Sequence, residues 1–316
     1  MTERPTIHVV SMSGGKDSTA TALLALETQP RDSIRFVFAD TGNEHQATHD
    51  YLDYLRGALG ITIDTVRADL TSAIERLRGV LQTIADGGRV PRFRWTAEEA
   101  RRALKAVRPS GNPFLDLCVL KGRFPSRRAQ FCTQFLKTEP LVEYQMALID
   151  AGAAVWSWQG VRGEESPERA RKPSFEVVGG GLFINRPILR WRAADTFEAH
   201  RAVGIEPNPL YRQGMSRVGC MPCINANKNE VLEIAARFPE HFKRISEWER
   251  VVAAACKRGA ASFFAAPNDG RGDRVGRNIT QVVQWSRTSR GGRQLDMLRD
   301  PSAEAPACSS SYGLCE

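Results

Sequence analysis

The stretch with the most evident chemistry lies near the amino terminus, where Ser13-Gly14-Gly15-Lys16-Asp17-Ser18 separates two apolar runs. Residues 7–12 are β-branched and apolar, which is typical of a buried strand, and residues 18–26 space their large apolar side chains as a helix does. The two glycines let the backbone turn sharply between them. A strand, a glycine turn and a helix start present unbonded N–H groups and a partial positive charge, so the stretch predicts a phosphate site.

The residues of this loop suggest separate roles. Lys16 is a mobile point charge that can reach phosphate oxygens, and Asp17 is a hard oxygen ligand suited to Mg²⁺. The Ser13 and Ser18 hydroxyls can donate hydrogen bonds to phosphate. The loop is not a Walker A motif, because Val10 stands in place of the first glycine and Asp17 follows the lysine. The alternative is a strand-to-helix turn that uses glycine for its geometry alone.

Two further polar clusters follow predicted strands. Asp40 and Thr41 end the apolar run 34–39, and Gly160 and Arg162 follow the run 155–159. In parallel sheets, ligands bind beyond the carboxyl ends of the strands. We therefore expect these residues to meet the glycine loop at one nucleotide site, with Arg162 pairing with phosphate through its planar guanidinium.

The elements that must position these residues alternate between strands and helices. Further strands are predicted at residues 61–66, and helices at residues 44–59, 70–84 and 140–151. This alternation predicts an α/β fold with a parallel twisted sheet and helices on both faces. We expect a nucleotide-binding domain over residues 1–203, with a basic insertion at 87–131, and a cysteine-bearing region of helices and loops over residues 204–316.

Charge is unevenly distributed in the 316-residue chain, whose net charge is +8. Residues 89–137 hold twelve Lys or Arg against three acids, and residues 257–300 hold nine against four in Gly- and Arg-rich pieces that resemble loops. Thr96 and Glu99 form a predicted capping box for a short basic helix. Basic groups interleaved with aromatic side chains suit a nucleic acid, and the alternative is a solvated helix face.

The cysteines and the apolar runs bear on location and metal binding. No run reaches membrane-spanning length, so we expect a cytoplasmic protein with no membrane partner. Seven cysteines in a reducing compartment are expected to be thiols or metal ligands. Cys220 and Cys223 form a C-x-x-C pair, which is a metal or redox spacing. A tetrahedral zinc site and plain buried thiols remain alternatives to an iron–sulfur cluster, and Cys256, in an apolar helix, is expected to be a buried thiol.

Several motifs together carry a resemblance to a known family. The loop Ser13–Ser18 resembles the SGGxDS loop of the PP-loop ATP pyrophosphatases. The chain also contains FADTGNEH (38–45), FCTQFLKTEPL (131–141), GVRGEES (160–166) and NPLYRQGMSRVGCMPC (208–223). With the loop, these motifs resemble the phosphoadenosine phosphosulfate reductase family, whose relatives include sulfurtransferases of DNA phosphorothioation. The resemblance implies an adenine nucleotide alpha-hydrolase-like fold, an adenine nucleotide ligand and an enzyme of sulfur metabolism.

The resemblance also implies a metal site and two alternative reactions. It places Cys132, Cys220 and Cys223 on a [4Fe–4S] cluster, with the fourth ligand expected from Cys315 and with Cys118, Cys256 or Cys308 as alternatives. The first reaction is cleavage of ATP between the α and β phosphates, with Mg²⁺, to activate an acceptor such as nucleic acid for sulfur transfer. The second is reduction of a sulfonucleotide to sulfite. A sulfur donor protein or a thioredoxin-like reductant would be the partner. The intact loop favours ATP cleavage.

Overall fold

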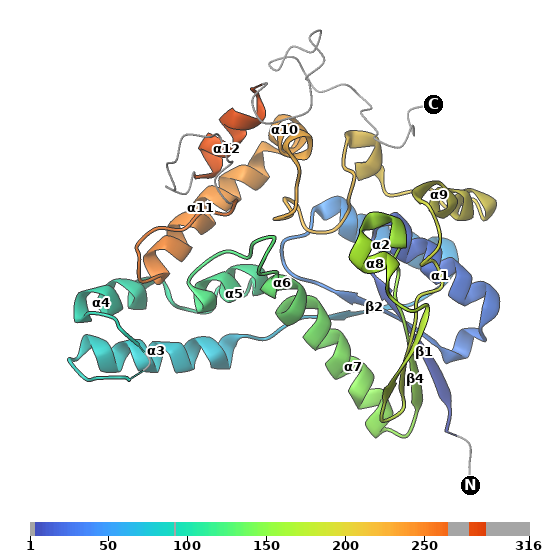
Figure 1. Cartoon of the computed structure of the whole chain (residues 1–316), viewed down its shortest axis with the longest axis horizontal. Helices are drawn as coiled ribbons and strands as arrows, with labels where there is room; N and C mark the ends of the chain where they lie inside the picture. The colour runs from blue at the N-terminus through green and yellow to red at the C-terminus, as the bar shows by residue number, and fades with distance from the viewer. Residues whose placement is uncertain (1–3, 92, 265–277, 289–316) are drawn as a thin grey trace. The chain divides into compact units, whose positions relative to one another are not determined.

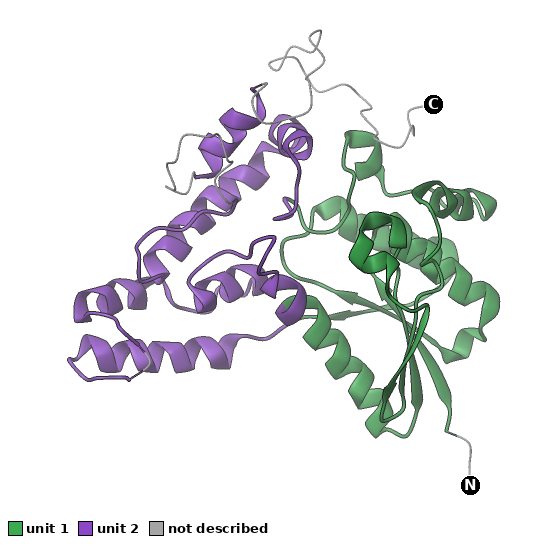
Figure 2. Ribbon diagram, viewed as in Figure 1, with its two compact units in different colours: residues 1–67, 136–221, 308–316 green, residues 68–135, 222–307 purple. Residues whose placement is uncertain are grey.

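The computed structural model describes residues 4–91, 93–264 and 278–288, and its elements are labelled in Figure 1. The chain forms two compact units. Unit 1 comprises residues 1–67, 136–221 and 308–316, and unit 2 comprises residues 68–135 and 222–307 (Figure 2). The basic segment that the sequence marks as an insertion at 87–131 therefore belongs to the same unit as most of the carboxyl-terminal region. None of the described helices is long and apolar enough to cross a membrane.

Unit 1 contains a six-stranded sheet with the strand order β3-β2-β1-β4-β6-β5. Its strands are β1 (Thr6–Met12), β2 (Ile34–Ala39), β3 (Ile63–Val66), β4 (Ala154–Trp158), β5 (Phe175–Gly179) and β6 (Leu182–Asn185). Its helices are α1 (Lys16–Thr28), α2 (Gln46–Leu59), α7 (Glu139–Asp150), α8 (Pro167–Ala170) and α9 (Ala193–Ala202), with short 3₁₀ turns η1 (Arg31–Ser33), η3 (Gly163–Glu165) and η4 (Pro209–Gln213).

Both faces of this sheet are covered, which explains why the central strands are continuous apolar runs. On one face, side chains of β1 and β2 pack with α1 and α2 in a core that includes Phe36, Leu52 and Leu55. On the other face, Val9, Val37 and Val155 pack against apolar side chains of α7. The α/β fold with helices on both faces is confirmed.

The sheet departs from the prediction at one edge, where β5 pairs antiparallel with β6. The other four strand pairings are parallel. Gly180 and Gly181, both with positive φ, join β5 to β6, and a link this short can connect only antiparallel strands. Sequence pattern does not predict this hairpin, because all five residues of β5 are exposed and lack the pattern of a buried strand.

The start of α2 differs slightly from the prediction. The helix begins at Gln46, and His45 caps it by accepting a hydrogen bond from the Ala47 N–H at 2.9 Å. Asn43, in the preceding loop, is fully buried and is not the cap. That loop thus keeps a defined conformation of its own between β2 and α2.

Unit 2 is helical in its described residues. Its helices are α3 (Thr71–Ala85), α4 (Ala97–Ala106), α5 (Pro113–Lys121), α6 (Phe131–Thr133), α10 (Lys228–Arg237), α11 (Pro239–Ala255) and α12 (Ile279–Ser286), and a π-helical turn η2 (Gln134–Thr138) follows α6. The predicted capping box of Thr96 and Glu99 is present at the start of α4. The helix α12 lies between the Gly- and Arg-rich pieces of the stretch 257–300 that resemble loops, and its capping box of Asn278 and Gln281 was not recognised in the sequence.

Candidate functional site

The glycine loop joins β1 to α1 in the middle of the sheet. Because β1 ends at Met12 and α1 begins at Lys16, three residues carry the chain from the strand into the helix. Gly14 has a φ of 70°, in the left-handed region that favours glycine. A Cβ atom at Gly14 would lie 2.8 Å from the Thr48 Cγ2 atom of α2. Both the backbone conformation and the close approach of α2 therefore require glycine here.

The hydrogen bonds of the loop leave four of its main-chain N–H groups available. The Ser18 hydroxyl donates to the Gly15 carbonyl at 2.9 Å and accepts from the Ser13 N–H at 3.1 Å. The two serine hydroxyls also lie 3.1 Å apart, so both are engaged inside the loop. Among the described residues, no acceptor receives the N–H groups of Gly14, Gly15, Asp17 and Ser18. N–H groups at the start of a helix form an anion site.

A segment almost 200 residues away in sequence holds this loop in place. The Asn208 side-chain amide donates to the Gly14 carbonyl at 3.1 Å, and the Tyr211 hydroxyl accepts from the Lys16 N–H at 2.9 Å. Asn208 and Tyr211 are each only 1% exposed. These two residues fix the loop from outside, and their role was not predicted, although both lie in the NPLYRQGM motif.

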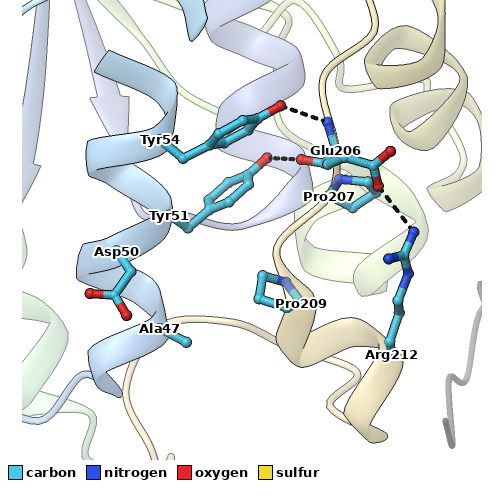
Figure 3. A pocket seen from close by; sticks show the side chains of 8 residues that line it. All are labelled: Ala47, Asp50, Tyr51, Tyr54, Glu206, Pro207, Pro209 and Arg212. Carbon is cyan, nitrogen blue, oxygen red and sulfur yellow. Dashed lines mark hydrogen bonds and ion pairs between the residues drawn. The ribbon is translucent and has the colours of Figure 1, made fainter. Parts of the chain in front are cut away.

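The segment that holds the loop, residues 206–212 and called the brace below, is itself held against α2, as Figure 3 shows. The Tyr51 hydroxyl donates to the Glu206 carbonyl at 2.8 Å, and the Tyr54 hydroxyl accepts from the Glu206 N–H at 3.1 Å. Arg212 pairs with the Glu206 carboxylate at 3.0 Å. Between α2 and this segment lies a pocket of about 370 Å³. The tyrosines thus anchor the brace through its backbone.

Charged side chains surround the start of α1. Lys16 Nζ lies 3.4 Å from one oxygen of Asp17, and Arg162 Nε lies 2.5 Å from the other. Arg162 also pairs with Glu164 and lies 3.8 Å from Glu165, and its side chain is only 3% exposed. Burial opposes the charge of the guanidinium, but the Asp17 and Glu164 carboxylates outweigh burial and raise the pKa of Arg162. Asp17, which we expected to hold Mg²⁺, pairs with two cations in this structure.

Gly160 brings the end of β4 against the same helix. A Cβ atom at Gly160 would lie 3.0 Å from the Asp17 carbonyl oxygen and 3.1 Å from the Thr21 hydroxyl. The absence of a side chain therefore allows the strand end to approach the first turn of α1. This approach brings Arg162 within reach of Asp17.

The loop after β2 forms a compact polar turn. Asp40 accepts from the Gly42 N–H at 2.8 Å and from Arg67 Nε at 2.9 Å. The Thr41 hydroxyl donates to the buried Glu44 carboxylate at 2.7 Å, and the Thr41 N–H donates to it at 3.1 Å. Because β1 and β2 are parallel neighbours, the glycine loop and this turn both lie at the carboxyl edge of the sheet, where these two strands end. That edge is where the sequence predicts a nucleotide site.

The two cysteines of the C-x-x-C motif have different surroundings. In unit 1, Cys220 Sγ lies 3.4 Å from the Thr41 hydroxyl and donates to the Glu44 carboxylate at 3.6 Å. In unit 2, Cys223 Sγ accepts from the Asn225 N–H at 3.5 Å. Cysteine sulfur is a soft ligand that suits zinc and iron–sulfur clusters, so the donor type of this pair fits such a group.

The remaining cysteines divide by exposure. Cys132 is partly exposed in α6, whereas Cys118 in α5 is fully buried. Burial, with a smaller contribution from Cys132, raises the pKa of the Cys118 thiol. The Cys256 thiol donates to the Ala253 and Ala260 carbonyls at 3.4 Å, as a buried structural thiol does. Cys308 and Cys315, the predicted sources of a fourth ligand, lie outside the described residues.

Comparisons with known proteins show which family the chain resembles. A family model for the phosphoadenosine phosphosulfate reductase domain matches residues 7–111 and 116–226. The chain is 44% identical to an uncharacterized 37.8 kDa protein in the gpa 5′ region of Escherichia phage 186, over 98% of this chain and 97% of that protein. A crystal structure of phosphoadenylyl-sulfate reductase from Candida auris, a phosphate complex, is similar with a TM-score of 0.40 and 17% identity, over 69% of this chain and 82% of that one.

A relative with a named activity matches over a shorter region. The chain is 34% identical to an adenosine 5′-phosphosulfate reductase of Neisseria meningitidis serogroup B, over 43% of this chain and 49% of that protein. The chain thus spans about half the length of this reductase and nearly all of the phage protein. The match of the family model over both strand-end loops and the C-x-x-C motif decides the assignment. This chain belongs to the phosphoadenosine phosphosulfate reductase domain family.

Proposed function

We propose that this protein is an enzyme that cleaves ATP between the α and β phosphates at the Ser13–Ser18 loop. The observation that carries the proposal is the row of four N–H groups at the start of α1 that no described residue accepts, next to the buried Lys16. Such a row suits the oxygens of a pyrophosphate group. The cleavage activates an acceptor for the transfer of sulfur.

The chemical step follows from the charges around the loop. An acceptor oxygen attacks the α-phosphorus, and the bond from this phosphorus to the bridging oxygen breaks as pyrophosphate leaves. Lys16 and the N–H groups stabilise the negative charge that develops on the pyrophosphate. Asp17 orients Lys16 and Arg162 through its two oxygens and is our candidate ligand for the Mg²⁺ that accompanies ATP. Asp40, Thr41 and Gly160 border the nucleotide on the neighbouring strand ends. A sulfur nucleophile then displaces AMP from the activated acceptor.

The cysteines are proposed to serve the sulfur step. Cys132, Cys220 and Cys223 are the proposed ligands of an iron–sulfur cluster, with Cys315 as the fourth, and zinc is the alternative. Such a cluster would supply a binding site for the sulfur that is transferred. Cys118 and Cys256 are less suited to this role, because both thiols are buried. The partners would be a sulfur donor protein and an acceptor, for which nucleic acid is our candidate.

The second candidate function is reduction of a sulfonucleotide to sulfite. Its support is the adenosine 5′-phosphosulfate reductase from Neisseria meningitidis, which is 34% identical to this chain over 43% of its length. In that reaction, a cysteine thiolate attacks the sulfur of the sulfonucleotide, and a thioredoxin-like reductant then releases sulfite. Cys315 would be the candidate nucleophile. An intact phosphate loop is not needed for this reaction, because the substrate lacks a β phosphate.

Product analysis separates the two functions. We would incubate anaerobically purified protein with ATP labelled at the α phosphate, with and without nucleic acid, and in parallel with adenylyl sulfate and its 3′-phosphorylated form. ATP cleavage predicts labelled AMP and pyrophosphate, and both should disappear in Asp17→Asn. Sulfite released from a sulfonucleotide without any ATP turnover would instead establish the reductase. An absorbance spectrum of the same sample, with iron, sulfide and zinc contents, shows whether the cysteines hold an iron–sulfur cluster or zinc.

A further inference from the structure

A basic groove lies in unit 2 on the helices α11 and α12, with the end of α10 beside it. Its volume is about 500 Å³. Apolar side chains of Phe242, Ile279 and Val283 contribute to its lining, and Lys243, Arg250 and Arg287 are its cationic side chains. Lys243 and Arg250 are seven residues apart on α11, which is two helical turns and about 10 Å. They therefore lie on the same face of the helix.

The three cations of this groove are exposed and uncommitted. None of Lys243, Arg250 and Arg287 forms an ion pair or a side-chain hydrogen bond with a described residue. The lining contains a single carboxylate, that of Glu247, which is also exposed. The groove thus carries a local excess of two positive charges that the described part of the chain does not neutralise.

Several cations of the predicted basic insertion are, by contrast, used inside unit 2. Arg101 donates to the Ala85 carbonyl at 2.9 Å, and Arg102 donates to the Cys256 carbonyl at 2.8 Å. Lys121 lies 4.0 Å from the centre of the Phe135 ring. These side chains stabilise the packing of helices and turns within the unit. The insertion therefore combines cations that are used inside unit 2 with exposed ones such as Lys105 and Arg108.

We propose that the groove between α11 and α12 binds a short single-stranded segment of nucleic acid. The cations neutralise phosphates, and the apolar lining accepts the faces of unpaired bases, a combination typical of single-strand binding. A duplex cannot present base faces to such a lining. The groove proposal names a single-stranded nucleic acid as the acceptor, and only this identification rests on the proposed function. The binding itself requires no ATP and can be tested separately.

Fluorescence anisotropy with labelled twenty-nucleotide strands of dT and rU, and with a duplex of mixed sequence, tests the proposal. The triple variant Lys243→Gln, Arg250→Gln, Arg287→Gln should bind a single strand at least tenfold more weakly than the wild type. Its salt dependence should be shallower by roughly two log units per log unit of salt, because each lost phosphate contact on a single strand removes about 0.7. Glu247→Gln should bind two- to threefold more tightly, because it removes the repulsive carboxylate.

A control variant that loses three positive charges elsewhere tests whether the weaker binding comes from the groove or from the lower net charge. The triple variant Arg31→Gln, Lys172→Gln, Arg201→Gln removes three exposed cations from unit 1 and should retain most of the single-strand affinity. Equal losses in the two triple variants, a preference for the duplex, or unchanged binding in the groove variant would each overturn the proposal. Thermal unfolding of each variant confirms that the fold persists. Affinity for dT relative to rU identifies the preferred nucleic acid.

The binding test of the groove and the ATP test of the proposed function can fail independently. ATP binding without nucleic acid is measured by calorimetry in the groove variant, whose changes lie outside the phosphate loop and should leave the affinity for ATP unaltered. If the wild type cleaves no ATP but the groove variant loses single-strand binding, the ATP function fails and the groove proposal stands. If ATP is cleaved and the groove variant binds nucleic acid as the wild type does, only the groove proposal fails.

Discussion

The two units differ sharply in how they carry charge. Unit 1 holds 17 Lys and Arg against 20 Asp and Glu, whereas unit 2 holds 27 against 16. The excess that makes the chain basic therefore lies wholly in the unit without the phosphate loop. The net charge of +8 thus reflects the composition of unit 2, where the groove is proposed to bind a second anionic ligand.

The units also differ in where their functional cations lie. In unit 1, Lys16 and Arg162 are each 3% exposed and are paired with carboxylates. In unit 2, Lys243 and Arg250 are exposed and unpaired among the described residues. Buried, paired cations hold a fixed geometry that suits a small, highly charged group, whereas exposed cations adapt to an extended strand. The contrast predicts different costs of mutation in the two units.

The largest effect is expected at Arg162. Arg162→Met leaves Asp17 with Lys16 as its remaining cation and removes the pair with Glu164, which should lower the free energy of unfolding by about 3 kcal/mol. Urea denaturation measures this loss. The matched control is Arg201→Gln, which breaks an exposed pair with Glu198 and should cost under about 1 kcal/mol. Equal small losses in both variants would show that the Arg162 cluster does not stabilise unit 1.

The next effect concerns pH and His200. This side chain in α9 is fully buried, neither ring nitrogen has a hydrogen-bond partner among the described residues, and burial lowers its pKa to about 4. The unfolded chain binds a proton near pH 6.5, so stability should fall by roughly 3 kcal/mol as the pH drops from 6.5 to 4. His200→Phe should remove most of this dependence. A wild type with flat stability over this range would contradict the burial of a neutral imidazole.

A smaller effect is expected in the interior of unit 2. The buried Glu249 of α11 accepts from the Phe263 N–H at 2.8 Å and from the Ile279 N–H at 3.0 Å. Burial raises the pKa of its carboxyl, although the two N–H groups oppose this. Glu249→Gln retains one acceptor oxygen and should cost about 2 kcal/mol of unfolding free energy. Because Ile279 begins α12, the same variant should also weaken single-strand binding by the groove.

The brace of the phosphate loop should give the smallest change in stability. Tyr211→Phe removes the acceptor for the Lys16 N–H and should cost about 1 kcal/mol. Tyr54→Phe, the control, removes an exposed acceptor for the Glu206 N–H, which water can replace, and should cost less. Only Tyr211→Phe should also weaken ATP binding, as measured by calorimetry. Identical ATP affinities for the two variants would contradict the role of Tyr211 at the loop.

Local pattern predicted most of unit 1. The strands at residues 7–12 and 34–39 and the helices that cover them follow from apolar periodicity and glycine turns, and the capping box at Thr96 follows from spacing. The bracing contacts could not be predicted, because Asn208 and Gly14 are far apart in sequence and no spacing relates them. The helix α12 was missed because its short apolar stretch lies among Gly- and Arg-rich residues. Exposure, which decides whether a cation is available, is likewise invisible in the sequence.

The central claim is that the α1 loop of unit 1, and not the basic surface of unit 2, binds the nucleotide. Calorimetric titration of ATP with Mg²⁺ into wild type, Lys16→Gln and Arg250→Gln tests it directly. Loss of a charge-assisted contact to phosphate costs about 1.5–3 kcal/mol, so Lys16→Gln should bind ATP roughly ten- to a hundredfold more weakly. Arg250→Gln should bind ATP as the wild type does. Equal ATP affinity in wild type and Lys16→Gln, or a loss confined to Arg250→Gln, would contradict the account.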